Sequence, residues 1–65
     1  MEVKFTDLDG NEIMTVHGRN QFVPRQGERV FIDDNLYTVF KVFHWYTNRE
    51  NEKPKMYTEV ELVKQ

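Results

Sequence analysis

Apolar and polar residues alternate along most of this chain, and turn-forming residues interrupt the alternation at short intervals. A period of two is typical of β-strands that bury one of their two faces. Val3 and Phe5 flank Lys4 near the start, and Val30 and Ile32 share a face in the middle of the chain. No stretch shows a convincing helical periodicity. The sequence therefore predicts an all-β chain.

Turn signals divide the chain into about five strands. Asp9–Asn11 favours a hairpin within residues 2–17, because Asp, Gly and Asn tolerate positive φ. Asp33–Asn35 is a second polar turn, and residues 47–55 form a polar loop. The expected strands are the two halves of the 2–17 hairpin, residues 28–32, residues 36–46 and residues 56–64.

The connection into the third strand carries two residues with special backbone properties. Pro24 fixes φ and lacks an N–H, and Gly27 reaches conformations that are closed to other residues. Together they predict a bend that leads into residues 28–32, with positive φ at Gly27.

The fourth strand is the longest, and its alternation breaks once. Tyr37 and Val39 point to the same face, and simple alternation would place Lys41 there as well. A buried lysine is rare. We therefore predict a β-bulge near Phe40–Lys41 that moves Val42 onto the inner face.

A meander of 65 residues forms a single domain, 1–65, and has to curl in order to bury one face and protect its edges. A long, bent fourth strand shared between two sheets is how small barrels achieve this curvature. We predict a small five-stranded barrel built as an antiparallel meander. Its expected core consists of Val30, Ile32, Val39, Val42, Val60 and Leu62.

The run P-x-x-G-E-x-V-x-I-x-x-x-x-Y-x-V, residues 24 to 39, resembles the central hairpin of SH3-like barrels. It is similar to small, stand-alone SH3-like barrel domains of uncharacterised bacterial and phage-type proteins. The resemblance covers about half of the chain and implies the fold more than the function, because many unrelated activities occur on this barrel. The residues that carry it are Pro24, Gly27, Glu28, Val30, Ile32, Tyr37, Val39 and Val42, together with the closing Val60–Leu62.

The chain contains no cysteine, which excludes a disulfide framework and a thiolate metal site. Its first ten residues alternate in polarity and contain no apolar run of signal-peptide length. No window reaches the length that spans a bilayer. These features predict a cytoplasmic protein with no membrane association.

The residues that carry catalysis or hold metals are sparse. Serine and cysteine are absent, and a threonine or lysine nucleophile needs an activating base in a cleft, which a barrel of this size seldom encloses. His17 and His44 are the only histidines, and no short ligand spacing joins them to acidic residues. Asp7–Gly10 begins like a calcium loop, but the glycine of that motif stands sixth and Gly10 is fourth. We therefore expect no enzymatic activity, no metal and no cofactor.

Nine aromatic residues, 14% of the chain, are more than one small interior can bury. Consecutive strand residues alternate faces, so within Phe43–Tyr46 whichever pair packs inward leaves the other pair outward. Phe31 lies on the face of its strand opposite to that of the inward-facing Val30, and Phe40 falls at the expected bulge. An exposed aromatic cluster usually marks an interaction site. The alternative is that residues 47–55 fold over the cluster as a local lid.

Two functional classes follow from these features. In the first, the aromatic surface binds protein, either a second copy of the chain or another partner. In the second, the aromatic rings stack the bases of a single-stranded nucleic acid while Arg19, Arg25, Arg29 and Lys41 hold its phosphates. The net charge of −2 counts against the second class, because nucleic-acid binders usually carry a basic excess. The sequence therefore predicts a non-enzymatic protein-interaction module. The candidate binding residues are Phe31, Phe40, His44, Trp45, Tyr46, Arg25 and Arg29.

Overall fold

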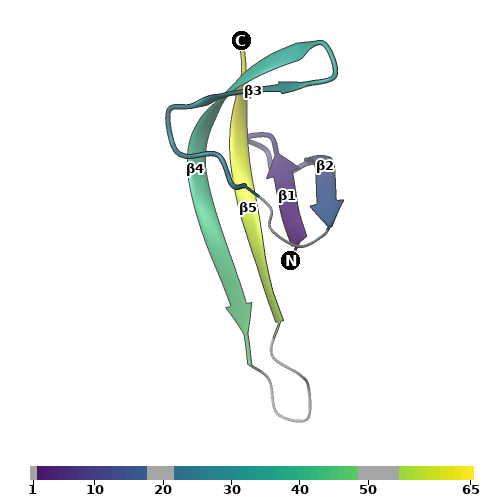
Figure 1. Ribbon diagram of the computed structural model, residues 1–65, viewed down its shortest axis with the longest axis vertical. Helices are drawn as coiled ribbons and strands as arrows, with labels where there is room; N and C mark the ends of the chain where they lie inside the picture. Colours follow the sequence, from purple (N-terminus) through teal and green to yellow (C-terminus); the bar gives the residue numbers. More distant parts are fainter. Residues whose placement is uncertain (1, 18–21, 49–54) are drawn as a thin grey trace.

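The computed structural model describes residues 2–17, 22–48 and 55–65, which form one curled sheet of five strands (Figure 1). This confirms the all-β class, and the bounds of β3, β4 and β5 differ by at most one residue from those predicted. In the part of the chain that the structure describes, no helix has the length and apolar character needed to cross a membrane. The strands are β1 (Glu2–Thr6), β2 (Glu12–His17), β3 (Arg29–Ile32), β4 (Asn35–Thr47) and β5 (Lys55–Lys64).

The strand order is β2-β1-β5-β4-β3, and one of its neighbouring pairs is parallel. β1 runs parallel to β5, with Val3 opposite Thr58 and Phe5 opposite Val60. The prediction of an antiparallel meander is therefore wrong at this pair. The reason is that five strands of alternating direction leave the first and the last running the same way. When the sheet curls until these two strands meet, they have to pair in parallel.

The curled sheet stays open between β2 and β3, which are its two edge strands. Among the described residues, no ladder joins these two strands, so the sheet forms a half-barrel (Figure 1). The connection between β2 and β3 covers residues 18–28, of which residues 22–28 are described. The sheet thus has the curvature of the predicted barrel, but the described residues do not close it into a complete barrel.

The core lies on the inner, concave face of the sheet. Val3, Tyr37, Val39, Val60 and Leu62 are buried there, and Val60 has no exposed surface. Three further predicted core residues contact this cluster from its margin and are only partly buried, because the half-barrel leaves one side uncovered. These residues are Val30, Ile32 and Val42.

The predicted bulge in β4 is confirmed. Val39 lies opposite Leu62 and Lys41 lies opposite Glu61, so Phe40 is an extra residue with no partner of its own on β5. The Lys41 ammonium lies 5.3 Å from the centroid of the Phe40 ring. Past the bulge, Val42 faces inward opposite Val60, as the sequence predicted.

Gly27 forms the bend that leads into β3. Its φ is 89°, in the left-handed region that favours glycine. This conformation lets the Gly27 N–H donate to the Val39 carbonyl at 2.9 Å, while the Val39 N–H donates to the Glu28 carbonyl at 2.8 Å. The bend therefore attaches the connection to β4 just before the bulge.

Replacing Gly27 by valine is expected to lower the free energy of unfolding by about 1–3 kcal/mol. The cost is backbone strain, because a Cβ at this position would meet nothing within 4 Å. Urea unfolding should be compared with that of Gln26→Val, the neighbouring turn residue, which we expect to change stability by about 0.5 kcal/mol or less. Equal midpoints for the two variants would contradict the strain at Gly27.

Asp7 organises the hairpin turn between β1 and β2. One of its carboxylate oxygens accepts hydrogen bonds from the backbone N–H groups of Asp9 and Asn11, each at 2.9 Å. Gly10 completes the turn with a φ of 86°. The hydrogen bond from the Asn11 backbone is the main reason why the pKa of Asp7 lies below its ordinary value.

A lowered native pKa makes the Asp7 turn sensitive to acid. Its ionised carboxylate stabilises the fold above the unfolded-state pKa, about 3.9, and this contribution is lost as the pH falls through the lower native pKa. Asp7→Asn cannot ionise, so we expect its melting temperature to lie furthest below that of the parent near neutral pH. Thermal melts between about pH 2 and pH 7 should show this gap narrowing below about pH 4. A gap that is independent of pH would contradict the role of the carboxylate.

Candidate interaction surface

β4 and β5 extend together beyond β3, and at their far end they also extend beyond β1. Phe43–Thr47 pairs with Lys55–Glu59, and we call these paired segments the arm. On one side of the arm, β3 pairs only with Asn35–Thr38 of β4. On the other side, β1 pairs with Tyr57–Glu61 of β5 and does not reach the tip of the arm. Figure 1 shows the arm as the lower part of β4 and β5.

The arm exposes aromatic side chains on both of its faces. By alternation from the inward-facing Val42, Phe43 and Trp45 lie on the outer face, and His44 and Tyr46 lie on the inner face. The exposed fractions are 38% for Phe43, 47% for Trp45 and 70% for Tyr46. We expected one pair to pack inward, and neither pair is buried. The flanking strands end before the tip of the arm, so the inner face there is not part of the core.

On the outer face, a row of side chains crosses three strands. The Trp45 and Tyr57 rings stack with centroids 6.0 Å apart and an interplanar angle of 14°. The Lys4 ammonium lies over the same Tyr57 ring, 4.8 Å from its centroid. The row thus links β4, β5 and β1 through contacts that each contribute about 0.5–1.5 kcal/mol.

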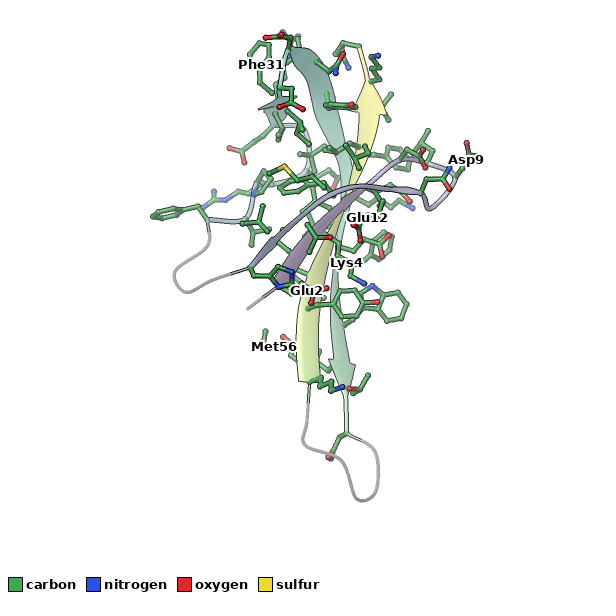
Figure 2. The ribbon with its side chains drawn as sticks, turned by 90° about the vertical axis from the view of Figure 1, so that its right-hand side faces the viewer. Glu2, Lys4, Asp9, Glu12, Phe31 and Met56 are labelled. Atoms are coloured by element: carbon green, nitrogen blue, oxygen red, sulfur yellow. The ribbon has the colours of Figure 1, made fainter. Side chains whose placement is uncertain are left out.

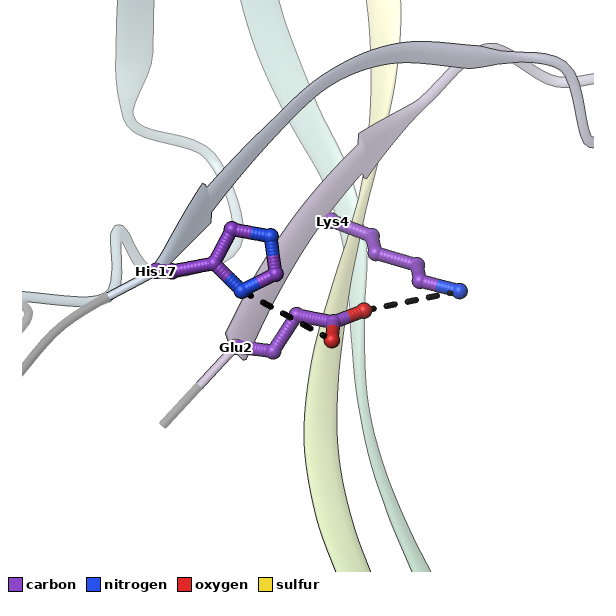
Figure 3. A network of polar contacts seen from close by, with 3 residues as sticks. All are labelled: Glu2, Lys4 and His17. Atoms are coloured by element: carbon purple, nitrogen blue, oxygen red, sulfur yellow. Dashed lines mark ion pairs between the residues drawn. The ribbon is translucent and has the colours of Figure 1, made fainter.

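Polar contacts continue this row toward β2. The Lys4 ammonium lies 3.6 Å from one carboxylate oxygen of Glu2, and the His17 Nδ1 lies 3.9 Å from the other (Figure 3). The Lys4 and Glu2 side chains are each about a third exposed, so this pair contributes at most about 1 kcal/mol. Its effect is to hold Lys4 beside Tyr57 (Figure 2 shows Lys4 and Glu2 on β1).

The inner face of the arm begins at a surface hollow of about 340 Å³. His44 lines this hollow, and its Nδ1 lies 3.1 Å from the hydroxyl of the buried Thr58. Arg25 is the charged side chain at the hollow. Across the part of the chain described, no group of three His, Cys, Asp or Glu residues could hold a metal ion. The hollow is lined by Val23, Pro24, Arg25, Gln26, Val42 and His44.

The structure divides the predicted binding residues among several places. His44 and Tyr46 lie on the inner face of the arm, and Trp45 lies on its outer face. Phe40 is at the bulge and is 44% exposed. Arg25 is in the connection and lines the hollow beside His44, and Arg29 and Phe31 are on β3, away from the arm. Figure 2 shows Phe31 and Met56 toward opposite ends of the molecule.

Sequence reasoning missed four residues of this surface. The alternating pattern does not decide which face Phe43 takes, and it does not indicate that Met56, Tyr57 and Lys4 belong to this surface. Tyr57 lies opposite Trp45, and Met56 lies opposite Tyr46. The alternating pattern of residues 56–64 gives the face of each side chain but not its partner on β4. The predicted lid of residues 47–55 depends on residues 49–54, which lie outside the described residues.

Comparison of the chain with protein-family models, curated proteins and solved structures finds no match.

The stacked pair predicts a measurable coupling between Trp45 and Tyr57. In a double-mutant cycle with Trp45→Leu and Tyr57→Leu, we expect a coupling free energy of about 0.5–1.5 kcal/mol from urea unfolding. The matched control pairs Tyr57→Leu with Phe31→Leu, because Phe31 lies on β3 and makes none of the described ring contacts. The control pair should be additive within about 0.5 kcal/mol. Additivity of the Trp45 and Tyr57 changes would contradict a stabilising stack.

Proposed function

We propose that this protein is a non-enzymatic interaction module that associates with a second copy through the aromatic surface of the arm. The observation that carries the proposal is the exposure of Phe43–Tyr46, in which all four consecutive residues are exposed. Exposed aromatic clusters of this kind usually mark binding surfaces, where aromatic residues are enriched. The core is small, so binding a partner would stabilise the protein further by removing more apolar surface from water.

Charge supports a protein partner over a nucleic acid. The nucleic-acid alternative needs basic side chains beside the exposed rings. On the outer face, Phe43 lies opposite Glu59 and Trp45 lies opposite Tyr57. Of the basic residues named for this alternative, Arg29 lies on β3 and Arg19 lies outside the described residues. Arg25 lines the hollow beside His44, and Lys41 lies over the Phe40 ring at the bulge. On the outer face, the Lys4 ammonium beside Tyr57 is already paired with Glu2. Phosphate groups there would meet the Glu59 carboxylate next to Phe43.

We further infer that the half-barrel is a variant of the SH3-like barrel. The Pro-x-x-Gly-Glu-x-Val run, residues 24–30, leads through the connection into β3, and its Gly27 has the positive φ that the run predicts. The long β4 with its bulge supports the same assignment. The inference concerns the fold, and the proposed association rests on the arm alone.

The proposal can be tested by changing the Tyr46–Met56 pair to threonine. Both side chains are exposed, at 70% and 47%, and threonine favours strands, so the fold should persist. Light scattering over increasing concentration should show the parent rising from 7.9 kDa toward twice that mass, while Tyr46→Thr/Met56→Thr stays monomeric. Thermal melts should place the variant within a few degrees of the parent.

Phe31→Thr is the matched control, because Phe31 is 73% exposed but lies on β3. It should associate like the parent. A parent that remains at 7.9 kDa up to millimolar concentration would overturn the proposed self-association. Titration with a short single-stranded oligonucleotide tests the alternative, for which saturable, salt-sensitive binding would be the supporting result.

A further inference from the structure

The second half of β4 is an open strand edge. From Val42 to Thr47, β4 pairs with β5 on one side, and among the described residues no strand or connection pairs with it on the other. This edge forms the left margin of the lower sheet in Figure 1. An open edge leaves backbone N–H and C=O groups available to another strand.

The register shows which residues present these groups. Val39 directs its N–H and C=O away from β5, to Glu28 and Gly27. On β5, alternation from its partner Leu62 then turns Glu61 and the odd-numbered residues before it toward β4. Past the bulge, Lys41, Phe43 and Trp45 lie opposite these odd-numbered β5 residues and direct their backbone N–H and C=O groups toward β5. The β4 residues between them direct their backbone groups toward the open side. The open side is therefore presented by Val42, His44 and Tyr46.

This edge lacks the usual protection against pairing. Proteins commonly block exposed edges with prolines, charged residues, bulges or very short strands. Val42–Thr47 contains no proline, glycine, lysine, arginine or carboxylate, and it is rich in β-forming residues. The bulge and Lys41 stand at one end of the segment. The connection residues Val23–Gln26 line the hollow beside Val42 and His44, and none of them has a described backbone hydrogen bond to the strand there.

We propose that this edge pairs with the same edge of a second copy, antiparallel, with the two-fold axis at His44. The proposal rests on the proposed function and specifies how the two arms meet. The resulting sheet would continue through both half-barrels. Because the same segment is used by both copies, the contact closes as a dimer.

The length of the regular strand selects the axis. Residues that are opposite each other in an antiparallel pair share a face, so the axis has to pass through a residue. The regular part of β4 runs from Lys41 to Thr47, and its midpoint is His44. An axis at Phe43 would place Tyr46 against the bulged Phe40, and an axis at Trp45 would leave two residues of the segment unpaired.

Side-chain chemistry fits this register. Phe43 would meet the Trp45 of the other copy on the outer face, and Val42 would meet Tyr46 on the inner face. Aromatic and branched cross-strand pairs of this kind are stabilising. Lys41 would meet Thr47, and the two His44 side chains would face each other at the axis.

The available surface predicts a weak dimer. With aromatic side chains covering about 150–250 Å² each, the exposed fractions of Phe43, Trp45 and Tyr46 leave about 300 Å² of ring surface on each copy. The exposed ring surface of two copies is thus about half of the ~1,200 Å² of total surface that the smallest stable interfaces bury. The paired backbone edges add to this area, and we expect a dimer that dissociates on dilution.

Single-cysteine variants test the register, because the chain has no cysteine of its own. At the axis, Cα atoms of the two copies would be about 5.5 Å apart, within the range that a disulfide requires. His44→Cys should therefore cross-link most under mild oxidation. Phe43→Cys and Trp45→Cys should each give a lower yield of disulfide, because the Cα atoms of the two copies would be more than about 8 Å apart at these positions. Cysteine at Phe31 is the matched control. A maximum at another position, or no disulfide at concentrations where the mass doubles, would overturn the proposal.

Amide hydrogen exchange separates this inference from the proposed function. On association, the amides of Val42, His44 and Tyr46 should become protected by about tenfold or more, while those of Phe43 and Trp45 face β5 and should be slow in both states. A doubled mass without this alternating protection would overturn edge pairing and retain self-association. No change in mass would overturn both.

Proline substitution provides a second measurement. His44→Pro removes an N–H from the open side, where an edge strand tolerates proline, so the variant should stay folded and become monomeric. Phe43→Pro removes an N–H that faces β5 and should destabilise the monomer itself. A folded His44→Pro that still dimerises would contradict pairing through this edge.

Discussion

Phe40 is the extra residue of the bulge, and it therefore decides which face of the sheet each later side chain of β4 occupies. Before it, Val39 faces inward, and without the extra residue Lys41 would face inward as well. A buried ammonium group without a partner costs several kcal/mol, so the shift that brings Val42 inward instead protects the core. The same shift decides that Phe43 and Trp45 share the outer face, and that the backbone groups of the residues between them face the open side. The core and the two faces of the arm therefore depend on one inserted residue.

The exposed arm follows from the unequal lengths of the strands. β4 has 13 residues and β5 has 10, whereas β1 has five and β3 has four. A long pair flanked by short strands has to leave part of its surface uncovered on both faces. Here the uncovered part is also the most aromatic part of the chain. The contacts on the outer face stabilise the arm as an extended platform, because Trp45 is stacked on Tyr57 and Lys4 lies over the same ring.

Local chemistry made much of this fold predictable from the sequence. The positive φ of Gly27, the turn after Asp7 and the bulge beside Lys41 each follow from what one or two residues tolerate. The parallel pairing of β1 with β5 was not predicted, because strand order depends on contacts between the two ends of the chain. For the same reason, Tyr57 could not be assigned to Trp45, since their register is set across residues 47–55. The exposure of both faces of the arm depends on where β1 and β3 end. The residues of Phe43–Tyr46 do not determine the ends of those strands.

The parallel pair of β1 and β5 also has a consequence for folding. Val3 is buried beside Thr58, so the first strand cannot complete its side of the core until Tyr57–Glu61 has been made. Until β5 joins the sheet, the β1–β2 hairpin therefore lacks the strand that covers its side of the core. Closing a contact of this sequence separation carries a large entropic cost, and topologies of high contact order fold slowly for that reason. β5, which pairs with both β1 and β4, is therefore the strand that completes the sheet.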